Sequence, residues 1–185
     1  PALRLAVDQA LEGVSTTQLA AATTSLSQRY RNEVRDGRLH LSDQLAAQAY
    51  IAARMPATYA AIHTSLAAAA QRLPDFSPAS LLDLGAGPGT ALWAAQSVWP
   101  DLQSATLIET SPSIRAIGQK LAAASSVARI DWQDANIARA TPTAAADIVT
   151  LAYVLDELEP ADRTKLVDSL WSRTRGLLVI VEPGT

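Results

Sequence analysis

A short apolar segment followed by three closely spaced glycines is the feature of this sequence that most constrains its fold. Leu81-Leu82-Asp83-Leu84 runs directly into Gly85-Ala86-Gly87-Pro88-Gly89, and a helix-forming stretch begins at Thr90. A glycine-rich turn between a strand and a helix brings the backbone close to a ligand and directs helix N-terminal amides at its negative groups. A dinucleotide fingerprint would require glycine or alanine where Thr90 stands, so the spacing differs from that pattern.

After a proline-containing linker at 74–79, apolar segments alternate with helix-forming segments. Strands are expected at 81–84, 105–109, 128–132, 147–154 and 177–181, and helices at 90–98, 112–124 and 160–173. Strands that are apolar throughout are buried on both faces and belong to parallel sheets covered by helices on both sides. The sequence therefore predicts an α/β fold, a Rossmann-like doubly wound parallel sheet over residues 80–185.

Residues 1–74 are rich in alanine and are expected to form an all-helical N-terminal subdomain. Ser15 and Thr16 are candidate N-caps for one of its helices, and Ser42-Asp43 can cap the next. Pro56 is expected to end or kink the second of them, because proline lacks the backbone amide and clashes with the preceding turn. A further helix is expected over residues 57–72.

The composition excludes several classes of function. The sequence contains no cysteine, which excludes disulfides, thiolate metal sites and a cysteine nucleophile from this segment. A net charge of -3 provides no overall basic field for nucleic acid or an anionic membrane, and no apolar run approaches the roughly 20 residues of a membrane span. His40 and His63 lie far apart and are interpreted as surface or packing residues, so no metal is expected. A cytoplasmic location is the expected one.

The glycines at 85, 87 and 89 behind Asp83 resemble the first motif of class I methyltransferases, which use S-adenosyl-L-methionine (S-adenosylmethionine). The resemblance implies that Asp83 faces the methionine end of the cofactor and that the glycines leave room for the cofactor's path. It also implies the strand order 3-2-1-4-5, with the last strands of the class absent. The chain is therefore expected to be a fragment in which strand 177–181 is a bare edge or is covered by another molecule.

Three further positions extend the predicted cofactor site. Glu109 ends the second strand, where an acidic side chain accepts from both ribose hydroxyls. Asp134 follows the third strand, where an acid in this class accepts from the adenine amino group; Asp131 is the alternative but is expected inside the strand. Tyr153 either lines the methyl-transfer pocket or is a core aromatic residue. The predicted cofactor-binding residues are Asp83, Gly85, Ala86, Gly87, Pro88, Gly89, Glu109, Thr110, Asp134, Ala135 and Tyr153.

No catalytic residue is predicted. Methyltransferases that act on exocyclic amines of nucleic acids usually carry an Asn/Asp-Pro-Pro-Tyr type motif after the fourth strand, whereas this chain has Tyr153-Val154-Leu155-Asp156. Pyrimidine C5 methyltransferases need a cysteine nucleophile, which the sequence lacks. A general base is required only where the methyl acceptor must lose a proton.

The segment 49–61, Ala-Tyr-Ile-Ala-Ala-Arg-Met-Pro-Ala-Thr-Tyr-Ala-Ala, resembles one family in particular: mitochondrial small-ribosomal-subunit assembly factors and their bacterial methyltransferase-like relatives. Residues 82–95 and the closing segment 181–185 are similar too, so the resemblance covers about residues 45–185. It implies association with the small ribosomal subunit or its rRNA. The cysteines that hold an iron-sulfur cluster in this family would lie beyond residue 185, so such a cluster is expected only there.

Arg29, Arg31, Arg35 and Arg38 form a candidate RNA contact that would hold phosphates without reading sequence. The alternative is a solvated helix face with acidic residues interleaved. The leading hypothesis is an S-adenosylmethionine-dependent, methyltransferase-like protein that acts on or with the small ribosomal subunit in rRNA maturation or translation. Two alternatives remain: a catalytically inactive assembly scaffold, and a small-molecule methyltransferase.

Overall fold

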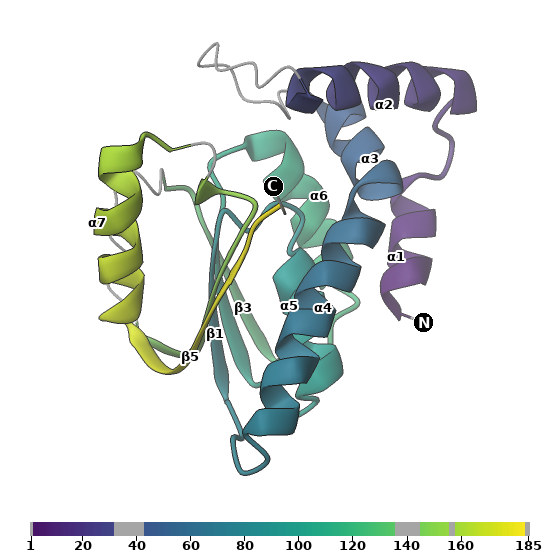
Figure 1. The fold of residues 1–185 in the computed structure, drawn as a ribbon. Helices are drawn as coiled ribbons and strands as arrows, with labels where there is room; N and C mark the ends of the chain where they lie inside the picture. The colour runs from purple at the N-terminus through teal and green to yellow at the C-terminus, as the bar shows by residue number, and fades with distance from the viewer. Residues whose placement is uncertain (1, 32–42, 136–144, 156–157, 184–185) are drawn as a thin grey trace.

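The computed structural model describes residues 2–31, 43–135, 145–155 and 158–183 (Figure 1). Helices precede the first strand, and among the described residues strands and helices alternate after it except between the third and fourth strands, as predicted. The elements in chain order are α1 (Ala2–Ala10), α2 (Thr16–Arg31), α3 (Gln44–Ala53), α4 (Met55–Arg72), β1 (Ser80–Leu84), α5 (Thr90–Val98), β2 (Ser104–Ile108), α6 (Pro112–Ala122), β3 (Arg129–Gln133), β4 (Ala146–Ala152), α7 (Pro160–Trp171) and β5 (Thr174–Val181).

The strands form one five-stranded sheet in the order β3-β2-β1-β4-β5, which confirms the predicted order. All four pairings are parallel, and the last residue of β1, Leu84, lies beside Ile108 of β2 and Leu151 of β4. The carboxyl ends of the three central strands therefore meet at one edge of the sheet, where doubly wound folds bind ligands. Within the described residues β5 pairs with β4 alone, so it occupies the expected edge position.

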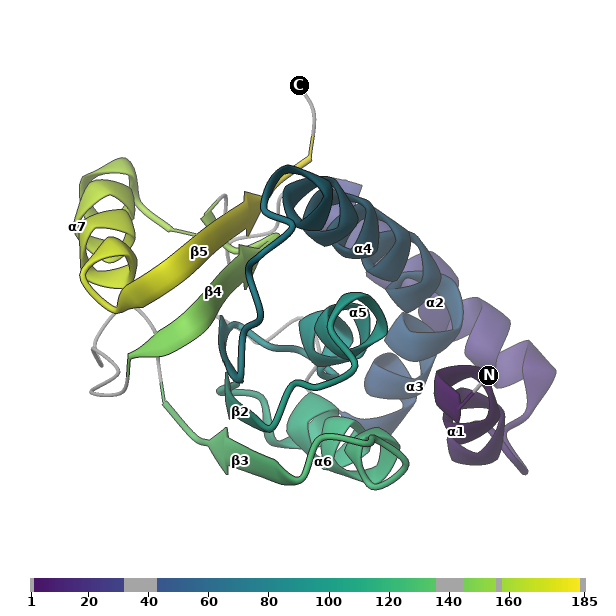
Figure 2. The ribbon, with the colours of Figure 1, turned by 90° about the horizontal axis from the view of Figure 1, so that it is seen from below.

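Helices lie on both faces of the sheet, as expected for the apolar central strands (Figures 1 and 2). The edge strand β3 differs, because its exposed polar residues alternate with half-buried apolar ones. Alternate side chains of β1 point to opposite faces: Leu81 packs in one core cluster with Leu92 of α5, and Leu82 packs in another with Leu166 of α7. α4 runs beside α5 on the first face, and α7 lies on the second (Figure 2). Because β1, β2 and β4 are largely buried on both faces, their carboxyl ends are the part of the central sheet left open to a ligand.

The N-terminal helices begin and end where local chemistry requires. Asp43 caps α3, since the backbone N–H of Ala46 donates to its Oδ1 at 2.8 Å, as predicted. α3 ends at Ala53, and Pro56 stands in the first turn of α4, where a missing N–H costs nothing. Pro56 thus begins a new helix at the predicted break.

The helical part shares a core with the α/β part. Ile51 of α3 packs in one buried cluster with Trp93 of α5 and Ile114 of α6. The division into a subdomain over 1–74 and a core over 80–185 stays a prediction. Among the described helices, none is long and apolar enough to cross a membrane. The arginine cluster from Arg29 to Arg38 lies outside the residues whose side chains the structure describes.

Candidate cofactor site

The loop after β1 is a backbone cradle that requires glycine. Gly85 and Gly87 have φ angles of 64° and 55°, in the left-handed region that favours glycine. A Cβ on Gly85 would lie 2.5 Å from Cγ2 of Val154, whereas a Cβ on Gly87 would meet no atom within 4 Å. Gly85 is thus required by packing, and Gly87 borders open space. The N–H of Ala86 donates to the carbonyl of Ile108 at 2.9 Å, which fastens the loop to β2.

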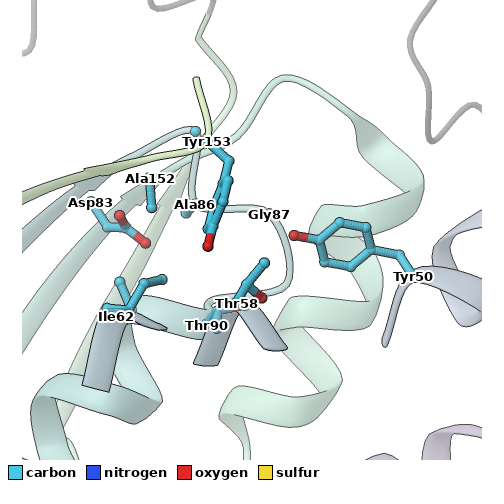
Figure 3. A pocket seen from close by; sticks show the side chains of 11 residues that line it. Tyr50, Thr58, Ile62, Asp83, Ala86, Gly87, Thr90, Ala152 and Tyr153 are labelled. Atoms are coloured by element: carbon cyan, nitrogen blue, oxygen red, sulfur yellow. The ribbon is translucent and has the colours of Figure 1, made fainter. Parts of the chain in front are cut away.

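A pocket lies beside this loop, between the carboxyl ends of β1 and β4 and the helices α3 and α4 (Figure 3). Figure 3 shows the hydroxyls of Tyr50 and Tyr153 pointing towards its centre from two different directions. Five polar side chains line it, four from helices and strands and one from the turn after β4. These are Tyr50 of α3, Thr58 of α4, Asp83 of β1, Thr90 of α5 and Tyr153 after β4.

Asp83 is the buried acid of the pocket. Its exposed fraction is 2%, and the Thr150 hydroxyl donates to its Oδ1 at 2.6 Å. Burial raises the pKa of Asp83 from its ordinary 3.8 to about 7, although the hydrogen bond from Thr150 opposes the rise. The carboxyl group points into the pocket in Figure 3. A cationic group beside this carboxylate would strongly stabilise its charged form, because burial is what disfavours that charge.

Glu109 follows β2 and joins two backbone segments of the site. Its Oε2 accepts from the N–H of Gly87 at 2.9 Å, and its Oε1 accepts from the N–H of Ser111 at 2.7 Å. Burial raises the pKa of Glu109, and these backbone hydrogen bonds oppose the rise. Glu109 is therefore held against the glycine loop and is not a solvated carboxylate at a strand end. Thr110 is the next residue, between Glu109 and the N-terminus of α6.

Asp134 follows β3 and is linked to Glu109 through one arginine. Nη2 of Arg115 lies 2.9 Å from Oδ2 of Asp134, and Nη1 of the same guanidinium donates to the carbonyl of Glu109. The Asp134 side chain is 63% exposed, so it is open to a ligand. Asp131 lies inside β3, as expected. Ala135 packs against the core cluster on the α7 face, and the adenine role of Asp134 stays a prediction.

Tyr153 is the one non-glycine residue with a positive φ, 59°, in the described part of the chain. Its N–H donates to the carbonyl of Val181 at 2.8 Å, and Oε1 of Glu182 accepts from the N–H groups of Val154 and Leu155 at 3.0 and 2.9 Å. The last residue of β5 and the residue after it thereby fix the turn that places Tyr153 at the pocket. Left-handed backbone in a non-glycine residue is costly and clusters at functional sites.

Sequence reasoning missed four polar residues around the site. Tyr50, Thr58 and Thr90 line the pocket, and Glu182 holds the turn at Tyr153. Tyr50, Thr58 and Glu182 lie in the segments 49–61 and 181–185, whose resemblance to the family assigned them no role. Thr90 was marked only by its place directly after Gly89.

The described histidine is a packing residue. The His63 ring stacks on Tyr59 with centroids 5.6 Å apart, and its Nε2 lies 3.5 Å from the Ser97 hydroxyl. No group of three potential metal-ligating side chains occurs among the residues that the structure describes. His40 lies outside them.

The fold and the position of the pocket place the chain among proteins with the methyltransferase fold. The plantazolicin methyltransferase BpumL, solved in complex with SAH, matches with a TM-score of 0.57 at 16% identity, over 96% of this chain and 61% of that one. An O-methyltransferase family protein from Burkholderia thailandensis matches with a TM-score of 0.54 at 19% identity, over 91% of this chain and 55% of that one. At these identities the likeness establishes the fold.

The family follows from sequence. The model of the family described as mitochondrial small ribosomal subunit Rsm22 matches residues 44–185, so the chain belongs to this family, as the segments quoted above predicted. It is also 33% identical over 142 residues to the human ribosome assembly protein METTL17, mitochondrial. That match covers 74% of this chain and 31% of the human protein, so the chain spans about a third of that relative. Because that relative is mitochondrial, the expected cytoplasmic location stays a prediction.

Proposed function

We propose that this protein binds S-adenosylmethionine in the pocket and acts in the assembly of the small ribosomal subunit. The observation that carries the first half is the arrangement around Gly87: open space beside the residue, with its amide held by Glu109. A ligand that lies against this backbone would also reach Asp83 and the carboxylate of Glu109. An adenosine linked to an amino acid offers partners for both acids.

The residues present fit this cofactor along its length. Asp83 would face the ammonium group of the cofactor. Gly87 would allow the cofactor to lie close to the backbone of the loop, and Glu109 would accept hydrogen bonds from the ribose hydroxyls. Asp134 would accept from the adenine amino group. The cofactor supplies an electrophilic methyl group, and the protein's part is to orient the reactants and exclude water.

The second half of the proposal is supported by membership of the Rsm22 family and by the likeness to a human ribosome assembly protein. The partner we propose is the small ribosomal subunit or its rRNA, and the process is subunit maturation. Assembly without methyl transfer is the second candidate function, favoured by the human relative's name as an assembly protein. Cofactor binding is common to both candidates.

Cofactor binding can be tested with a pair of glycine variants. Gly87→Val places a side chain in the pocket, whereas Gly13→Val imposes comparable backbone strain at a φ of 75° in the turn after α1. S-adenosylhomocysteine should raise the melting temperature of the full-length wild type and of Gly13→Val, since a ligand stabilises the state it binds. It should leave that of Gly87→Val unchanged. Equal increases in melting temperature for wild type and both variants would show that the ligand does not bind in this pocket.

Ribosome association calls for a separate experiment. The full-length protein, purified under native conditions from its own cells, should bring small-subunit rRNA and proteins with it in excess over those of the large subunit. Recovery of neither, or of both subunits equally, would contradict the proposed partner. Gly87→Val, purified in parallel, shows whether the association depends on an intact cofactor loop.

A further inference from the structure

The turn after β4 borders the pocket in a backbone conformation that is unfavourable without outside support. Tyr153 has a φ of 59°, which is costly for a residue with a side chain. In this conformation its hydroxyl points towards the centre of the pocket (Figure 3). The next residue, Val154, packs on the glycine loop, since a Cβ on Gly85 would lie 2.5 Å from its Cγ2. The turn therefore shapes the pocket only while it keeps this conformation.

The support for this turn comes from residues that do not line the pocket. The carbonyl of Val181, the last residue of β5, accepts from the N–H of Tyr153 at 2.8 Å. Oε1 of Glu182 accepts from the N–H groups of Val154 and Leu155 at 3.0 and 2.9 Å. Neither Val181 nor Glu182 is a lining residue. Three consecutive amides of the turn are thus held from the end of β5.

Glu182 uses only one of its carboxylate oxygens for this contact. Its Oε2 is buried and has no hydrogen-bond partner among the described residues. Within the described part of the chain, the hydrogen bonds of this side chain go to the turn alone. Burying a carboxylate oxygen without a partner is costly, so a gain in stability does not by itself explain the position of Glu182.

We propose that Glu182 is a positioning residue for the cofactor: it lies outside the pocket and acts through Tyr153, which contacts the ligand. The inference rests on the proposed function and adds to the cofactor site the end of β5, which contributes no lining residue. Without the carboxylate, the turn relaxes from its left-handed conformation and Tyr153 leaves the pocket. Only the fraction of molecules that keeps the turn then binds tightly, and the apparent affinity falls by that fraction.

Calorimetry with S-adenosylhomocysteine on full-length variants measures this dependence. Glu182→Ala should weaken binding by about tenfold, as expected when about a tenth of the molecules keep the turn. Tyr153→Ala should weaken it by a similar factor, and the double variant should be no more than about twofold weaker still, because both changes remove the same contact. Glu182→Gln keeps an oxygen that can accept from both N–H groups and should bind within about twofold of wild type.

Asp147 offers a matched control at the opposite end of the same strands. Its Oδ2 accepts from the N–H groups of Ala79 and Ser80 at 2.9 and 3.0 Å, much as Glu182 accepts from two amides of the turn. Asp147→Ala should therefore lower the stability comparably and leave the affinity unchanged. An equal loss of affinity in Asp147→Ala would overturn the proposal, as would wild-type affinity in Glu182→Ala. Losses that multiply to about a hundredfold in the double variant with Tyr153→Ala would overturn it too.

A second measurement uses only the wild type and does not depend on how the variants fold. Because coupling between two sites is reciprocal, a ligand held by Tyr153 should slow hydrogen exchange at the amides of Val154 and Leu155 by at least about fivefold. The amides of Ala79 and Ser80 should change by less than about twofold. Unchanged exchange at the turn, or equal slowing at both pairs of amides, would overturn the proposal. Wild type that binds no S-adenosylhomocysteine would instead overturn the proposed function, and this inference with it.

Discussion

Replacing Asp83 by asparagine should make the protein more stable, and more so as the pH rises. The side chain is 2% exposed, and burial raises its pKa from 3.8 to about 7. Asparagine has nearly the same shape and keeps an oxygen that can accept from the Thr150 hydroxyl, which donates to Asp83 at 2.6 Å. The substitution therefore removes the ionisation and leaves the packing and the hydrogen bond in place.

The sign and size of the effect follow from proton linkage. Below pH 3.8 the carboxyl group is protonated in both the folded and the unfolded chain, and it contributes no pH dependence. Between 3.8 and about 7 the folded chain keeps a proton that the unfolded chain has lost, so the free energy of unfolding falls as the pH rises. At about 1.4 kcal/mol for each pH unit, the full difference is of the order of 4 kcal/mol.

Urea unfolding of wild type and Asp83→Asn at several pH values measures this directly. From about pH 5 to about pH 8, the advantage of the variant should grow by about 2–3 kcal/mol. Asp101→Asn, at an exposed aspartate outside the pocket, is the matched control and should give the wild-type profile. Parallel profiles for wild type and Asp83→Asn would show that Asp83 ionises freely in the folded protein, and the description of its site would be wrong.

Three other substitutions test separate contacts. Glu182→Ala leaves two partly buried N–H groups of the Tyr153 turn without their acceptor and should cost about 1–3 kcal/mol in unfolding free energy. Glu182→Gln should restore most of it. Gly118→Ala places a Cβ against the Trp132 ring and should lower the free energy of unfolding by about 1–3 kcal/mol in the same urea assay. Unchanged stability would show that the ring moves aside freely. Glu109→Gln should weaken S-adenosylhomocysteine binding, because it reduces charge-assisted hydrogen bonds that are worth about 1.5–3 kcal/mol each. An affinity that calorimetry finds unchanged within about twofold would show that the carboxylate does not contact the cofactor.

The sheet and its glycine loop could be predicted because their signals are local. Every strand except β3 contains an apolar run, and Gly85 and Gly87 stand where the backbone adopts left-handed conformations. The position of Glu109 beside the loop followed from the same pattern, because β1 and β2 end side by side. Once the strands are located, the carboxyl edge of a parallel sheet brings these residues together.

The partners across the pocket could not be predicted, since they depend on register and helix placement. Thr150 bonds Asp83 because the pairing of β1 with β4 sets these two residues opposite each other. Tyr50 reaches the pocket because α3 and α4 pack over α5 and α6, which helix-forming alanines do not specify. Glu182 looked like a residue just past a strand, and only the folded chain shows that its carboxylate holds the turn at Tyr153.

The central claim is that the pocket beside the glycine loop binds S-adenosylmethionine. Calorimetric titration of the full-length wild-type protein with S-adenosylhomocysteine and, separately, with NAD tests it most directly, because both ligands carry an adenosine and only one carries an amino acid. The predicted result is saturable one-to-one binding of S-adenosylhomocysteine and no measurable binding of NAD. Preference for NAD, or binding of neither, would contradict the assignment of the site.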